Sequence, residues 1–277
     1  MWSSNQKQPM KNNEITLDQA RKVLEVVDAG LSEGMGFPVP GQMCVEAAVC
    51  YALEQPHGDE PECVNEAVRK FKIRLNDSPW SSKDARAAGM RRLAIAQLGT
   101  NDKSFDEKKF VEVLVEQTIR KIVPYALRSA IKGIEDQKHK AAFEEAAVRC
   151  ERDGDLEAAK NAREAAYADA DAAYADAAAY TANAAYAAAA YAAADAAAAA
   201  AYAAAYADAA AAYADADAAA SAYAAAADAA AAAAANAAAG CVARNDIALN
   251  MSADIGVEAL RAAGAHGIKL MDQLIPA

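Results

Sequence analysis

The stretch YTANAAYAAAAYAAADAAAAAAYAAAYADAAAAY, residues 180–213, decides the fold of this chain, because it is written almost wholly in Ala, Tyr and Asp. It belongs to a longer Ala-rich run, residues 155–239, that contains neither Gly nor Pro. Ala has the highest intrinsic helix propensity, and no breaker interrupts the run. The sequence therefore predicts an all-α protein in which residues 155–239 form one long helix or a pair of helices.

The large apolar groups between Ala165 and Ala239 are all tyrosines, and four of them recur every eleven residues from Tyr180 to Tyr213. Eleven residues close about three helical turns, so these rings form a slowly drifting stripe like the seam of a coiled coil. The short Ala side chains beside the stripe let a second helix approach closely. We therefore expect the chain to self-associate as a homo-oligomer. The predicted interface comprises Tyr180, Tyr191, Tyr202, Tyr206, Tyr213 and Tyr223.

The charge of the Ala-rich run has one sign, because eight Asp and no Lys, Arg or Glu lie between Glu164 and Arg244. These residues carry −8 of the formal net charge of −11. Such charge keeps an Ala-rich surface in solution and argues against nucleic acid or an anionic membrane as a partner. Two alternatives stay open. A slipping gene repeat would give the same run without a selected function, and the run forms either a rod of roughly 110 Å or a hairpin.

The part of the chain before the Ala-rich run has ordinary composition and several segments of helical periodicity. Thr16 with Gln19 predicts a capping box at the start of the first helix. Ser104 with Glu107 predicts a second one, and Pro124 should bend or break the helix that follows. The expected domains are a disordered N-terminus at 1–14, a helical head at 15–153, the Ala-rich run at 155–239, and C-terminal helices at 241–277 that pack on the head or on a partner.

Location is inferred from what the sequence contains. The first residues lack the apolar run of a secretory signal, and Asp recurs too often in the Ala-rich run for a membrane span. Five Cys, an odd number in separate segments, fit a reducing compartment better than a disulfide framework. We therefore expect a cytoplasmic protein with free thiols.

Chemistry is expected around Cys44, which a Gly- and Pro-rich loop delivers to the start of a predicted helix. Backbone N–H groups and the helix dipole stabilise a thiolate, so Cys44 is a candidate nucleophile with a depressed pKa, paired with His57. Cys44, Cys50, His57 and Cys63 also carry the right atoms for a zinc site, although their spacing matches no standard zinc motif. The alternative interpretation is that Cys44 and Cys63 are small apolar residues of the core.

Three short motifs carry a resemblance. Residues 41–49 read GQMCVEAAV, residues 56–63 read PHGDEPEC, and residues 75–77 read LND. They resemble a group of uncharacterised phage and bacterial helical proteins with a similar Cys-Val-x-x-Ala-Val start, a Pro-x-x-Asp-x-Pro-x-Cys loop and a later Asn-Asp. The resemblance covers residues 15–130 and leaves the Ala-rich run outside. It implies that Cys44, Asp59 and Cys63 form one local binding site, and it brings no activity with it.

Three functions remain on the sequence alone. The first is a non-enzymatic interaction or assembly protein, a helical head on an Ala-rich stalk that binds a copy of itself or another protein. The second is a small-molecule or zinc-binding head that acts as a phage accessory factor. The third is a thiol-dependent hydrolase that uses Cys44 and His57. We favour the first, because the sequence contains no complete catalytic or nucleotide-binding motif.

Overall fold

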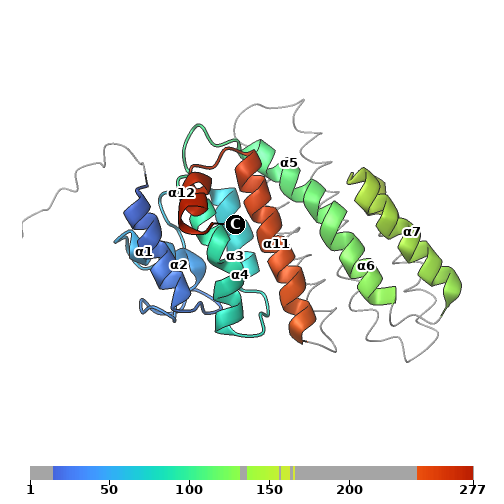
Figure 1. The fold of residues 1–277 in the computed structure, drawn as a ribbon, viewed down its shortest axis with the longest axis horizontal. Coiled ribbons are helices and arrows are strands. Elements are labelled where there is room, and N and C mark those ends of the chain that lie inside the picture. Colours follow the sequence, from blue (N-terminus) through green and yellow to red (C-terminus); the bar gives the residue numbers. More distant parts are fainter. Residues whose placement is uncertain (1–14, 132–135, 156, 163–164, 166–241, 277) are drawn as a thin grey trace, which may run out of the picture.

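The computed structural model describes residues 15–131, 136–155, 157–162, 165 and 242–276, and these residues form an all-α fold (Figure 1). Most of the Ala-rich run, residues 166–239 with the six predicted interface tyrosines, lies outside the described residues. Within them, extended backbone pairs at an isolated antiparallel bridge between Gly36 and Met43. The helices are α1 (Leu17–Asp28), α2 (Val45–Ala52), α3 (Glu66–Asn76), α4 (Lys83–Ala96), α5 (Glu107–Gln117), the π-helix η1 (Thr118–Ile122), α6 (Val123–Ile131), α7 (Gln137–Asp153), α11 (Val242–Ala262) and α12 (Gly267–Leu274).

The first helix begins as its sequence predicts. The Thr16 side chain accepts a hydrogen bond from the Gln19 N–H, and the Gln19 side chain accepts one from the Thr16 N–H, which completes the capping box. The capping box predicted at Ser104 is wrong. Asp106 is the N-cap of α5, and its carboxylate accepts the Lys109 N–H at 2.9 Å. The Ser104 hydroxyl instead donates to Asp102, because a short polar side chain in a turn bonds its near neighbours.

Pro124 does not break the helix that contains it. The segments α5, η1 and α6 follow one another without a gap, and the Val123 N–H donates to the Thr118 carbonyl five residues earlier. In a regular helix the proline ring would clash with the carbonyl four residues before it, on Arg120. The wider π-turn falls on the residues just before Pro124, so we attribute the continuity of the helix to this turn.

The main core is built around α4, which packs against α1, α2, α11 and α12 (Figure 1). Its buried side chains include Met90, Leu93 and Ile95. Two aromatic rings join the neighbouring helices, since Phe71 of α3 meets Phe110 of α5 edge-on with centroids 6.4 Å apart. Edge-to-face contact at this distance suits the charge distribution of aromatic rings.

The C-terminal helices lie on the head. Helix α11 crosses the front of the molecule in Figure 1 and packs against both α4 and α5, while α12 packs against α4 and α1. Leu249 and Leu260 of α11 and Met271 of α12 are buried in the main core. The chain thus completes this core only after residues 166–241 have intervened.

A second, smaller core lies between α6 and α7. Its buried residues come from η1, α6, α7 and the segment 157–162, and they are Ile119, Val123, Leu127, Phe143, Ala146, Ala147, Cys150, Ala158, Ala159 and Ala162. Among the residues that the structure describes, no helix is long and apolar enough to cross a membrane.

Candidate functional site

Cys44 occupies the N-cap of α2, where the sequence places it. Its Sγ accepts a hydrogen bond from the Ala47 N–H at 3.3 Å, and the side chain is buried. Burial disfavours the thiolate more than the backbone hydrogen bonds favour it, and the nearby Glu46 adds to the effect, so the pKa of the Cys44 thiol is raised to about 11. The depressed pKa expected from the helix N-terminus is therefore wrong. Cys44 is a neutral thiol at pH 7.

The other candidate ligands are not assembled into a metal site. Burial raises the pKa of the Cys50 thiol to about 12 and raises that of Cys63. His57 lies at the surface, with Nε2 3.1 Å from the Gly36 carbonyl oxygen. No three His, Cys, Asp or Glu side chains of the described residues are grouped to hold a metal ion. The described hydrogen bonds of Cys44 and His57 do not join the two, so the structure gives the predicted catalytic pair no support.

Two of the three residues in the predicted binding site do come together. Cys44 and Asp59 line one small cavity of about 20 Å³, and Glu46, Asn76 and Asp77 line it with them. Cys63 is not among its lining residues. A cavity of this size has room for about one water molecule, so it is too small for an organic ligand.

The Asn76-Asp77 pair of the third motif has a structural task, which is to hold the loop before α2. Asn76 Oδ1 accepts the Val45 N–H at 3.2 Å, and Asn76 Nδ2 donates to the Ser32 carbonyl at 2.9 Å. Asp77 Oδ1 accepts the Gly34 N–H at 2.8 Å. The end of α3 therefore fixes both the start of α2 and the loop that leads into it.

This loop, residues 33–42, is called the apolar loop below. Gly36 has φ +68°, and a Cβ added there would lie 2.0 Å from the Gln42 carbonyl oxygen, so the loop requires glycine at this position. The Phe37 N–H donates to that same carbonyl at 2.8 Å, which closes the turn. The loop displays apolar side chains to solvent, with exposed fractions of 47% for Met35, 69% for Phe37 and 47% for Val39.

A fully buried ion pair joins α2 to α3. Lys72 Nζ of α3 is 3.1 Å from Glu46 Oε1 of α2, and both side chains are 0% exposed. Apart from each other, neither group has a hydrogen-bond partner among the described residues. Burial raises the pKa of Glu46 and lowers that of Lys72, and the opposite charge of the partner counters each shift. Each group therefore depends on the other to remain charged.

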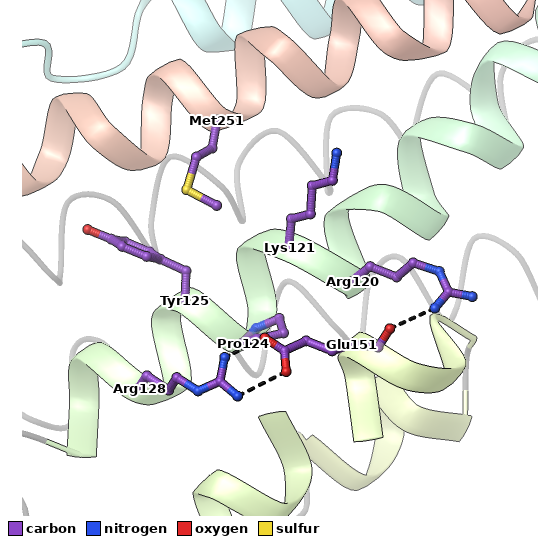
Figure 2. A pocket seen from close by; sticks show the side chains of 7 residues that line it. All are labelled: Arg120, Lys121, Pro124, Tyr125, Arg128, Glu151 and Met251. Atoms are coloured by element: carbon purple, nitrogen blue, oxygen red, sulfur yellow. Dashed lines mark hydrogen bonds and ion pairs between the residues drawn. The ribbon is translucent and has the colours of Figure 1, made fainter. Parts of the chain in front are cut away.

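A second cavity, larger than the one beside Cys44, is a groove that the sequence did not predict (Figure 2). It has a volume of about 460 Å³ and lies between the η1–α6 segment, α7 and α11. Met251 of α11 reaches toward Tyr125 and Lys121 of the facing helix, and Pro124 forms part of the wall. We call it the α6–α11 groove.

Three cations line the α6–α11 groove, and each is already paired. Lys121 Nζ lies 2.7 Å from Glu258, and Arg120 Nε lies 2.8 Å from Glu116. The Arg128 guanidinium bonds two carboxylates of α7, on Glu144 at 2.9 Å and on Glu151 at 2.9 Å. Its hydrogen bond lowers the pKa of Glu151. The groove therefore offers balanced charge rather than a free cluster of cations.

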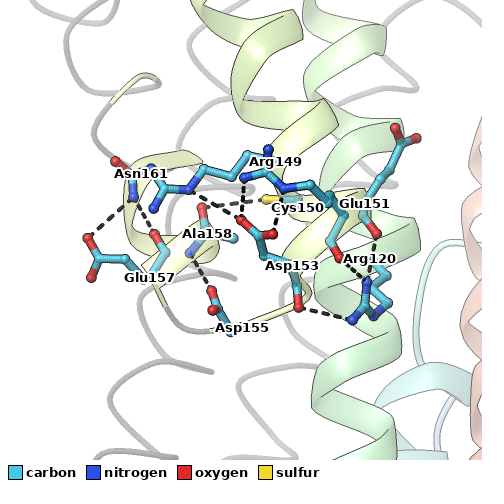
Figure 3. A network of polar contacts seen from close by, with 10 residues as sticks. Arg120, Arg149, Cys150, Glu151, Asp153, Asp155, Glu157, Ala158 and Asn161 are labelled. Carbon is cyan, nitrogen blue, oxygen red and sulfur yellow. Dashed lines mark hydrogen bonds and ion pairs between the residues drawn. The ribbon is translucent and has the colours of Figure 1, made fainter.

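Arg120 also closes the end of α7 (Figure 3). Its guanidinium donates to the carbonyls of Glu151, Arg152 and Asp153 at 2.7, 2.8 and 3.0 Å. A cation at a helix C-terminus satisfies carbonyls that have no partner within the helix. Gly154 follows with φ +64°, and a Cβ added there would lie 2.4 Å from Arg120 Nε. One side chain thus ties η1 to α7 beside the groove.

Sequence reasoning missed both Glu46 with Lys72 and the groove. A signal for the ion pair exists, since Lys72 follows Val68 by four residues and so falls on the apolar stripe of α3. Glu46 likewise stands alone among apolar residues in the short helix VEAAVCYA. The groove has no such signal, because its residues come from segments far apart in the chain. Comparison of this chain with family models, with curated proteins and with solved structures gave no match.

Proposed function

We propose that this protein is a non-enzymatic interaction protein that self-associates through its head and its Ala-rich run. The observation that carries the proposal is the apolar loop. Single exposed apolar side chains are normal on soluble proteins, but exposed apolar side chains gathered in one place are typical of contact surfaces. Phe37, at 69% exposed, is the strongest case, because aromatic side chains often dominate the energy of an interface.

Several polar contacts hold this loop in place. Besides Asn76 and Asp77, the buried Arg86 donates to the Leu31 carbonyl at 3.2 Å and to the Asn76 carbonyl at 2.7 Å. A loop fixed in advance loses little conformational entropy when it binds. This arrangement suits recognition of a partner, whereas a merely tolerated surface loop needs no such support.

The partner we propose is a second copy of the chain. The apolar loop supplies Met, Phe and Val, which are the large side chains that residues 165–239 lack, while that run supplies closely spaced Ala and Tyr. We therefore propose that the large apolar side chains of the loop on one copy pack among the small Ala and ring-bearing Tyr side chains of the run on the other. The raised pKa of Cys44 favours this reading over a thiol hydrolase.

Light scattering coupled to size exclusion tests the proposal on the full chain, whose monomer mass is 28.8 kDa. We expect the native protein to exceed the monomer mass and the Phe37→Ser, Val39→Ser double variant to move toward it. Val148→Ser is the matched control, because Val148 has the same exposed fraction as Val39, 47%, on a different face. A monomeric native protein, or an equal effect of the control, contradicts the proposal. A Tyr202→Ser, Tyr213→Ser variant tests the part assigned to the Ala-rich run.

A further inference from the structure

The α6–α11 groove has the dimensions of a small-molecule site. Ligand pockets commonly enclose about 300–1,000 Å³, and this groove, which is open to solvent, has a volume of about 460 Å³. It is built on helices rather than on loops, with α11 on one side and the η1–α6 segment and α7 on the other (Figure 2). Its walls therefore have fixed positions.

The walls suit an aromatic ring. Pro124 is buried and lines the groove with its apolar ring, while Tyr125 and the Met251 thioether are half-buried and face the same space. Sulfur makes favourable contacts with aromatic rings, and aromatic side chains prefer ring partners. The Lys121 side chain lines the groove as well, and its ammonium, which remains paired with Glu258, presents positive charge to the face of an electron-rich ring.

The charges of the groove argue against an anionic ligand. Lys121, Arg120 and Arg128 each have carboxylate partners at 2.7–2.9 Å, so a phosphate or carboxylate would have to displace an existing ion pair. The Glu151 carboxylate is held by Arg128, but a carboxylate has about four lone-pair sites, so it can still accept a hydrogen bond from a neutral N–H or O–H donor.

The π-turn gives a second indication, because Arg120 and Lys121 of the groove belong to it. A π-turn widens the helix at a cost in hydrogen-bond geometry, and such turns occur frequently at functional sites. Here the turn brings the side chains of η1 and of Pro124 to the wall of one cavity.

We propose that the α6–α11 groove binds a small, neutral, electron-rich aromatic molecule that carries one N–H or O–H donor, of the class of indoles and phenols. The ring lies among Pro124, Tyr125 and Met251, and its face meets the Lys121 ammonium. This site is separate from the apolar loop, and the proposal does not depend on self-association.

Titration of the full chain with 5-fluoroindole, followed by fluorine NMR, tests the proposal. We expect saturable binding at millimolar concentration or tighter, competition by unlabelled indole, and binding of benzoate weaker by at least about ten-fold. Met251→Trp fills the groove and should weaken 5-fluoroindole binding by at least about ten-fold, while Met251→Leu keeps the space and should stay within about two-fold.

Val148→Trp is the control for the added ring, since it places the same side chain on the exposed face of α7 and should leave binding unchanged. Circular dichroism shows whether each variant is folded. If Met251→Trp fails to fold, Lys121→Gln serves in its place, with a several-fold loss expected from the missing cation. Absence of saturable binding overturns the proposal. So does binding that Met251→Trp or its substitute leaves unchanged, or tighter binding of benzoate than of indole.

Discussion

Removing one member of the buried ion pair should destabilise the head far more than removing both. In Lys72→Met the Glu46 carboxylate loses its described partner in a site that is 0% exposed. Breaking a buried pair in this way costs about 3–5 kcal/mol, and replacing both members by apolar residues of similar volume is close to neutral. We therefore expect Lys72→Met and Glu46→Leu each to lose about 3–5 kcal/mol, and the double variant to lose less than either.

Urea unfolding of the four proteins in the cycle measures these free energies. Because a protein of this size loses about 2–4 °C in Tm per kcal/mol, each single variant should melt about 6–20 °C lower. Arg91→Met is the control, since the pair of Arg91 with Asp28 is partly exposed and should be worth less than about 1 kcal/mol.

The stability of Lys72→Met should depend on pH in a direction that follows from the pKa of Glu46. Burial raises the pKa of Glu46, and without Lys72 nothing counters that shift. A carboxyl whose folded pKa is raised contributes stability that is present below its unfolded pKa and is lost as pH rises through the folded value. The deficit of Lys72→Met should therefore be smaller at about pH 5 than at about pH 8. The proposed role of the buried pair would be refuted if the stability losses of the two single variants add up in the double variant. It would also be refuted if the stability deficit of Lys72→Met grew on acidification.

Three further outcomes are expected. Gly154→Ala should lower the free energy of unfolding by more than the roughly 1–2 kcal/mol that a left-handed Ala costs. The reason is that a Cβ at this position would lie 2.4 Å from the Arg120 guanidinium that caps α7. Gly34→Ala is the control in urea unfolding, because Gly34 has φ +63° and no atom within 4 Å of an added Cβ, so this variant should show the left-handed cost alone. Iodoacetamide at pH 7 should label Cys44 at least about 100-fold more slowly in the native protein than in urea, as read by peptide mass spectrometry, because its thiol pKa is raised to about 11. Arg128→Gln should lose less stability than the native protein when the pH falls below 4.5, the ordinary pKa of Glu151. Arg128 lowers the pKa of the Glu151 carboxyl in the folded protein, and the stability that this gives is lost as the pH falls through the lowered value. Equal acid sensitivity of the two proteins in thermal melts would contradict this.

The all-α class and the helix starts at Thr16 and Cys44 could be predicted from the sequence, because they depend on local chemistry. Thr16 with Gln19 is one such case, since both partners lie within four residues. Ser104 failed for a local reason too. Asp106 is an equally good cap two residues later, and the sequence alone does not rank the two. The break that the sequence allowed at Pro124 did not occur, because a π-turn precedes it, and the sequence alone does not reveal that turn.

The chemistry of the candidate site could not be predicted from residues that are close together in the sequence. The position of Cys44 at a helix N-terminus was correct, but its pKa depends on burial in the main core, which the spacing does not reveal. The same holds for Asn76 and Asp77, whose partners lie 31 to 44 residues away. Cys44 and Asp59 line one cavity while Cys63 does not, and this arrangement depends on long-range packing.

The return of α11 and α12 onto the head has a consequence during synthesis. In the sequence, the first part of the main core ends at Ala126 and the second part begins at Ala248, so 121 residues (127–247) separate them. A ribosome adds about 5–20 residues each second, so roughly 6–24 s pass between the synthesis of these two parts. Throughout that interval the faces of α4 and α5 that α11 covers are exposed. The nascent head is thus open to chaperones, or to a neighbouring nascent copy, for longer than the folding time of most small helical domains.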